Sequence, residues 1–87
     1  MLLYRVVFET DENTAQVTAK LPSLNNTADY GPTAEAALSN LRELAQGFLE
    51  VLAEQGVDLP PSDRAEAGRV YLSLVEPPAK PERKARS

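Results

Sequence analysis

The fold is decided by residues 21–56, LPSLNNTADYGPTAEAALSNLRELAQGFLEVLAEQG, where loop residues give way to a long run with helical periodicity. The segment PSLNNT (22–27) has the proline and asparagines typical of turns. The segment ADYG (28–31) leaves room only for a short strand before Pro32 restricts the backbone. The stretch therefore predicts a turn, a short strand and then a helix.

The helical part of this run has one broad apolar side. It extends from Ala34 to Gln55, with Thr33 placed to cap its start and Gly56 placed to end it. At about 100° per residue, its apolar side chains fall within an arc of roughly 160°, which needs a sheet beneath it. The residues of this arc are Ala34, Ala37, Leu38, Leu41, Leu44, Ala45, Phe48, Leu49, Val51 and Leu52.

The segments before this run have the two-residue period of β-strands. In LLYRVVFE (2–9) the even positions form one apolar face, while Leu3 and Val7 make the other face partly apolar. After the polar turn DENT (11–14), AQVTAKL (15–21) places Ala15, Val17, Ala19 and Leu21 on one side. These two segments predict a β-hairpin.

The last strand is predicted at RVYLSLVE (69–76), with Val70, Leu72 and Leu74 on its inner face. The connection before it, residues 57–68, has room for one helical turn after its prolines. The expected fold is α+β: a three-stranded antiparallel β-meander, one long helix and a final strand, in the order β-β-β-α-β. With the helix as a crossover, we expect the last strand to lie parallel to the first.

A single helix covers one face of such a sheet. Leu3, Val7, Tyr71 and Val75 would then remain on the other face as an apolar patch. This predicts a homo-oligomer, either a dimer or a tetramer, with these residues at its interface.

The chain is long enough for one domain, predicted at residues 1–76, and the basic, proline-rich residues 77–87 predict a flexible tail.

The net charge of −4 is unevenly distributed. Residues 1–79 hold five basic and twelve acidic side chains, whereas residues 80–87 hold four basic and one acidic. An acidic body of this kind suits a basic protein partner better than a phosphate backbone. Glu43, Glu50 and Glu54 line the polar side of the predicted helix, as a solvated face or a docking surface for a basic partner.

The composition also narrows the possible chemistry. The chain has no cysteine and no histidine, which removes thiol nucleophiles, thiolate metal sites and the commonest general base. It has no Gly-rich phosphate loop. We expect no catalytic site, metal site or cofactor. The N-terminus lacks the pattern of a signal peptide and the apolar runs are shorter than a membrane span, so we expect a cytoplasmic protein without membrane contact.

At this point residues 2–61 resemble the HicB antitoxins. An aromatic-rich strand, an acidic turn and a second strand lead into a P-x-L step at Pro22 and Leu24. The helix entry has the family pattern at Gly31, Thr33, Glu35 and Ala37, and the exit has it at Gly56, Leu59 and Pro60. The chain departs from the family at Asn25–Thr27, where many members have Gly-Cys. The eleven residues after Glu76 are also too few for the C-terminal DNA-binding domain that many members carry.

The resemblance implies a partial ribonuclease-H-like fold and a function. A HicB antitoxin neutralises a small basic mRNA-cleaving toxin, HicA, by covering its RNA-binding and catalytic surface, which an acidic body would suit. Without the C-terminal domain, we expect no specific binding of nucleic acid by this chain. The alternative is a stand-alone homo-oligomeric HicB-like domain that binds another protein or a small ligand.

Within this hypothesis the turns and the third strand supply the predicted toxin-binding residues: Asp11, Glu12, Asn25, Asn26, Asp29 and Tyr30. A ribonuclease-H-like fold also invites a two-metal nuclease. Its candidates are few, because Glu9, Asp11 and Glu12 crowd one hairpin turn and Asp29 stands apart. We therefore expect a protein that is not an enzyme.

Overall fold

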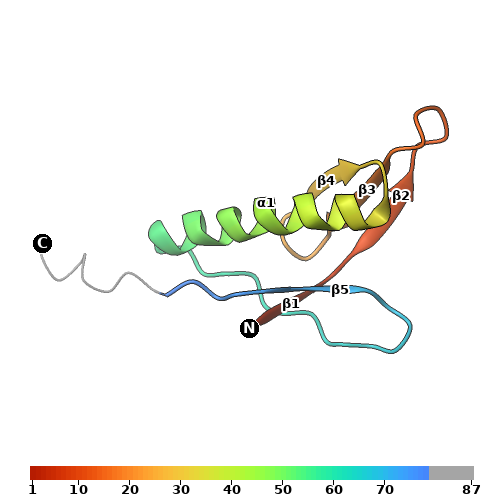
Figure 1. The fold of residues 1–87 in the computed structure, drawn as a ribbon. Coiled ribbons are helices and arrows are strands. Elements are labelled where there is room, and N and C mark those ends of the chain that lie inside the picture. The colour runs from red at the N-terminus through yellow and green to blue at the C-terminus, as the bar shows by residue number, and fades with distance from the viewer. Residues whose placement is uncertain (79–87) are drawn as a thin grey trace, which may run out of the picture.

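The computed structural model describes residues 1–78. They form an α+β domain with a three-stranded antiparallel sheet, one long helix and a further strand, as predicted (Figure 1). In chain order the elements are β1 (Leu2–Arg5), β2 (Val7–Thr10), β3 (Val17–Leu21), β4 (Thr27–Gly31), α1 (Ala34–Glu54) and β5 (Tyr71–Leu74).

The predicted first strand is divided at Val6 into two short strands that have different partners. β1 pairs with β5, and β2 pairs with β3, which in turn pairs with β4. Val6 itself donates its backbone N–H to the carbonyl of Val70 at 2.8 Å. Residues 2–10 therefore connect the two sheets. Their first half, β1, belongs to the β1–β5 sheet, and their second half, β2, belongs to the three-stranded sheet.

The last strand runs antiparallel to β1, so the predicted parallel arrangement is wrong. Residues 62 and 63 lie along the other edge of β1. The Ser62 hydroxyl accepts from the Leu3 N–H, and the Asp63 N–H donates to the Leu3 carbonyl, both at 2.8 Å. The chain then reverses at Gly68, whose φ is +81°, and returns along the opposite edge of β1 as β5. Residues 57–68, all described, contain no helical turn.

The core lies between α1 and the inner faces of both sheets. Its fully buried strand residues include Tyr4, Ala19, Leu21, Leu72 and Leu74, and its helix residues are Ala37, Leu41, Ala45 and Leu49. The even positions of residues 2–8 stay on the inner side despite the break at Val6. The alternation therefore predicted the buried face correctly.

Several residues expected on the inner face are exposed. Ala15 lies in the hairpin turn with φ +63°, so β3 begins only at Val17. Val70 precedes β5 and is 46% exposed, and Ala34 is exposed in the first turn of α1. Leu24, in contrast, lies in the loop between β3 and β4 and is fully buried. Its carbonyl accepts from the N–H and the hydroxyl of Thr27, which turns the chain so that the leucine points inward.

α1 begins directly after β4 and lies against it. Thr33 caps the helix as predicted, with its hydroxyl accepting from the Ala36 N–H at 3.1 Å. A Cβ atom on Gly31 would lie 2.8 Å from the Ala36 Cβ and from the Ala37 backbone nitrogen. The absence of a side chain at Gly31 therefore allows the start of the helix to approach the strand.

Side chains of α1 bind the outer edge of β5. The Arg42 guanidinium donates to the Ser73 carbonyl at 2.7 Å. The Gln46 amide donates to the Val75 carbonyl at 2.7 Å and accepts from the Val75 N–H at 3.1 Å. These contacts satisfy backbone groups that would otherwise form an open sheet edge.

Within residues 1–78, α1 is too polar to cross a membrane.

Candidate protein-binding surface

The six predicted toxin-binding residues do not form one surface. Asp11 and Glu12 lie in the turn between β2 and β3, whereas Asn25 and Asn26 lie in the turn between β3 and β4. Because β3 connects the two turns, they lie at opposite ends of the three-stranded sheet. A five-residue strand spans about 17 Å, which separates the two pairs.

Most of these side chains have a local backbone role. One Asp11 carboxylate oxygen accepts from the N–H groups of Asn13, at 2.8 Å, and Thr14, at 3.3 Å, which stabilises the turn. Asn25 and Asn26 both have φ +56°, a conformation that asparagine tolerates better than most residues. The Asp29 carboxylate accepts from the Tyr30 N–H. Turn chemistry therefore accounts for three of the six residues, and Asp29, which lies in β4, contacts the backbone next to it.

Tyr30 lies on the outer face of the three-stranded sheet, away from α1, and is 59% exposed. It forms a cross-strand row with Thr18 and Glu9. The neighbouring row consists of Val7, Lys20 and Ala28. No described element covers this face, which carries both charged and apolar groups.

The predicted oligomer interface is divided between the two sheets. Leu3 and Tyr71 lie on the outer face of the β1–β5 sheet and are half-buried, whereas Val75, just after β5, is 68% exposed. Val7 lies on the outer face of the other sheet. The loop after α1 occupies part of the first face, since the Tyr71 hydroxyl contacts the backbone of Arg64 and Glu66. The four residues therefore form a less continuous patch than the pattern predicted.

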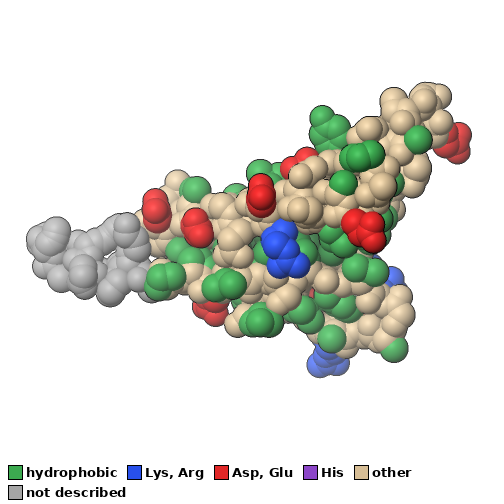
Figure 2. Space-filling model, in the orientation of Figure 1, with side chains coloured by type: hydrophobic (Ala, Val, Ile, Leu, Met, Phe, Trp, Pro, Cys, Tyr) green, Lys and Arg blue, Asp and Glu red, His purple; other side chains and the backbone are tan. Residues whose placement is uncertain are grey.

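The outward side of α1 has an apolar row beside an acidic one. Leu44 and Val51, expected in the buried arc, are 46% and 49% exposed. A Cβ atom on Gly47, between them, would meet no atom within 4 Å. Glu43, Glu50 and Glu54 run alongside this row. Figure 2 shows acidic side chains spaced along the helix with hydrophobic ones beside them. We call these six residues the α1 outer surface.

Leu44 and Val51 are exposed because of their direction around α1. The buried residues Ala37, Leu41, Ala45 and Leu49 form one row, and Leu44 and Val51 lie to one side of it. The sequence indicates this exposure in part, because both residues lie at the margin of the predicted apolar arc. An open hollow of about 670 Å³ lies next to Glu50 and Glu54, between α1 and residues 75–78.

The described carboxylates do not assemble into a metal site. Within residues 1–78, no group of three or more acidic side chains lies close enough together to hold a metal ion. Glu9 and Asp29, which the nuclease hypothesis would use, are on opposite faces of the three-stranded sheet, because Glu9 aligns with Tyr30 and Asp29 aligns with Ala19.

Comparison with known proteins supports the fold. No protein-family model matches the sequence, and no curated protein matches it. Among solved structures, the crystal structure of the N-terminal domain of the Burkholderia pseudomallei antitoxin HicB is similar, with a TM-score of 0.65 and 21% sequence identity. The similarity covers 82% of this chain and 93% of the other. The chain therefore has the fold of a HicB N-terminal domain, as the sequence predicted.

Proposed function

We propose that this protein is a HicB-like antitoxin, which is not an enzyme and which binds and neutralises a small basic mRNA-cleaving toxin of the HicA type. The observation that carries the proposal is the similarity over most of both chains to an antitoxin HicB domain. The charge of the body supports it, since residues 1–79 hold five basic and twelve acidic side chains. A basic toxin would be attracted to such a body.

We further propose that the toxin binds the α1 outer surface. Leu44 and Val51 offer apolar groups for the centre of an interface, and Gly47 leaves the space between them open. The neighbouring glutamates offer negative charges that would pair with basic residues of the toxin at the rim of the interface. The six residues proposed from the sequence fit this role less well, because the fold places them at opposite ends of the three-stranded sheet and Asp11 stabilises its own turn.

The first test is capture of a partner from the native organism with the full chain, followed by mass spectrometry. The proposal expects a small basic protein at stoichiometric yield. The purified pair should show no RNA cleavage, and the partner freed from the antitoxin should cleave RNA. Capture of a partner without ribonuclease activity, or of none, would contradict the antitoxin function.

The second test locates the interface. A double variant, Glu43→Gln with Glu50→Gln, should weaken toxin binding by about tenfold, because it removes charge from the rim. The matched control is Glu9→Gln with Glu12→Gln, which makes the same change of charge on the β2–β3 hairpin. Equal losses in both variants would show that only the net charge matters and that α1 is not the interface.

The alternative function is that of a stand-alone homo-oligomeric HicB-like domain with another protein or small-ligand partner. It is favoured by the outer sheet faces, where Val75 is 68% and Tyr30 59% exposed. An oligomer that captures no basic protein would support this alternative.

A further inference from the structure

Most of the basic side chains of the described residues line one hollow. Residues 1–78 contain five of them, and three of these line a single hollow of about 270 Å³ on the outer side of the β1–β5 sheet. These three are Arg5, Arg64 and Arg69, and the hollow is completed by Asp63, Glu66 and Tyr71. Residues 1–79 have a net charge of −7, so three arginines around one hollow are unusual for this protein.

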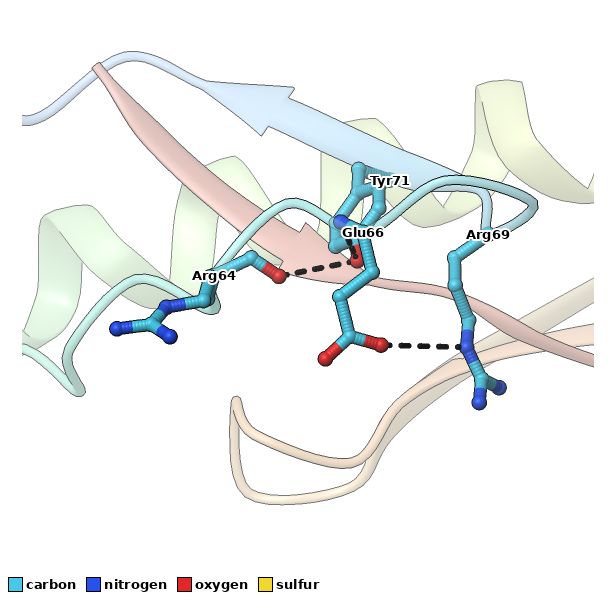
Figure 3. A network of polar contacts seen from close by, with 4 residues as sticks. All are labelled: Arg64, Glu66, Arg69 and Tyr71. Atoms are coloured by element: carbon cyan, nitrogen blue, oxygen red, sulfur yellow. Dashed lines mark hydrogen bonds and ion pairs between the residues drawn. The ribbon is translucent and has the colours of Figure 1, made fainter.

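Hydrogen bonds to the backbone hold the wall of this hollow in place (Figure 3). The Tyr71 hydroxyl accepts from the Glu66 N–H at 2.7 Å and donates to the Arg64 carbonyl at 3.0 Å. Arg5 lies directly across the sheet from Tyr71 and on the same face. The arginines are therefore attached to a formed structure and do not depend on a ligand to assemble it.

The acidic groups of the hollow already have partners. The two Asp63 carboxylate oxygens accept from the Arg5 N–H and from the Ser23 hydroxyl, each at 2.7 Å. The Glu66 carboxylate is paired with Arg69 at 3.6 Å. The guanidinium groups of Arg5 and Arg64, in contrast, have no hydrogen-bond or ion-pair partner among residues 1–78. With three arginines and two carboxylates, the hollow has an excess of one positive charge.

We propose that this hollow binds a small oxyanion, one phosphate or carboxylate group, at the guanidinium groups of Arg5 and Arg69. A planar guanidinium is the side chain best suited to bind such a group through paired hydrogen bonds. In Figure 3 the Glu66 carboxylate lies beside Arg69, its ion-pair partner, while the Arg64 side chain points away from both, so Glu66 already places one carboxylate on Arg69. A nucleic acid fits less well, because the rest of the body is acidic and would repel a long polyanion.

The test is a nuclear magnetic resonance titration of the full chain with inorganic phosphate and, separately, with acetate. We expect saturable shifts of the backbone amides of residues 63–71 with at least one of the two. Stronger binding of phosphate would assign the site to phosphate groups, and stronger binding of acetate to carboxylates. Shifts spread evenly over basic residues elsewhere would overturn the proposal, as would tighter binding of a short RNA per phosphate group.

Single variants make the test directional. Arg5→Gln and Arg69→Gln should each weaken binding roughly three- to tenfold, while Lys20→Gln, on the other sheet, should leave it unchanged. Glu66→Gln should strengthen binding, because it removes the competing carboxylate. The nuclear magnetic resonance spectrum of the backbone amides of Glu66→Gln would confirm that this variant is folded. Weaker or unchanged binding in a folded Glu66→Gln variant would overturn the proposal. Stronger binding would support it, because damage to the loop cannot explain a gain.

Discussion

At the scale of single residues, Gly31 allows α1 to lie against β4. A Cβ atom there would lie 2.8 Å from both the Ala36 Cβ and the Ala37 backbone nitrogen, neither of which is the end of a flexible side chain. Gly31→Ala should therefore force the helix away from the strand and lower the free energy of unfolding by about 1–3 kcal/mol. Urea denaturation with linear extrapolation measures this change.

Gly47 provides the matched control for Gly31. Its Cβ position is open and it lies inside the helix, so Gly47→Ala should raise the free energy of unfolding by up to about 1 kcal/mol. Opposite signs for the two substitutions are the expected result. Equal stabilisation by both would show that β4 and α1 are not in the close contact described.

Tyr4 is a fully buried residue with a polar end. Its side chain is completely covered and its hydroxyl donates to the Pro60 carbonyl at 2.6 Å, which connects the core to the loop after α1. Tyr4→Phe keeps the ring but removes this hydrogen bond, so it should lower the free energy of unfolding by about 1 kcal/mol at neutral pH. An unchanged urea midpoint would show that the contact contributes nothing to stability.

The same residue gives stability a pH dependence. Burial, and then the negative charges of Asp63 and Glu76, raise the pKa of the Tyr4 phenol above its ordinary value of 10.0. The folded protein therefore holds this proton more tightly than the unfolded chain. The stabilising effect is complete below the ordinary pKa and is lost as the pH rises through the raised one. The free energy of unfolding should fall more steeply above pH 10.0 in the wild type than in Tyr4→Phe.

At the scale of elements, α1 and β5 are joined by the side chain of Gln46. Its amide makes the two hydrogen bonds to Val75 that a neighbouring strand would otherwise make. Gln46→Ala should therefore increase hydrogen exchange at the Val75 amide and lower the free energy of unfolding by roughly 1 kcal/mol. Ser39→Ala, at an exposed position of the same helix, should leave exchange at the Val75 amide unchanged and should not lower the free energy of unfolding. Equal exchange at Val75 in both variants would contradict this role of Gln46.

The elements themselves were largely predictable because their signals are local. Thr33 caps α1, and the alternation of residues 2–8 identified the buried face. The break at Val6 and the antiparallel direction of β5 were not predictable, because both depend on where residues 62 and 63 lie. The sequence correctly placed Leu24 in a loop. Only the tertiary structure shows that this loop enters the core.

At the scale of the whole molecule, we predict a dimer or tetramer at micromolar concentration. The outer sheet faces retain apolar groups, Val75 and Tyr30 being the most exposed of them. Val7→Glu places a charge on the outer face of the three-stranded sheet and should dissociate the oligomer without unfolding it. Sedimentation equilibrium measures the mass, for which a single chain would give 9.5 kDa. The value for one chain at every concentration would contradict the oligomer.

The predicted tail begins at Pro77, which is half-buried and lines the hollow beside α1 together with Pro78. The remainder of that prediction, residues 79–87, lies outside the described residues. The flexible character of the tail and the limit of the domain at residue 76 remain predictions.

By itself the sequence determined the order of the strand and helix segments, the buried face of residues 2–8 and the resemblance to HicB, because periodicity, caps and turn residues act over a few positions. Tertiary structure alone decided which distant segments meet. It separated the predicted toxin-binding turns, exposed Leu44 and Val51, and brought Arg5 to the same hollow as Arg64 and Arg69. These outcomes depend on which side of α1 faces the sheets and on the course of residues 55–70, and both are set by contacts between segments far apart in the sequence.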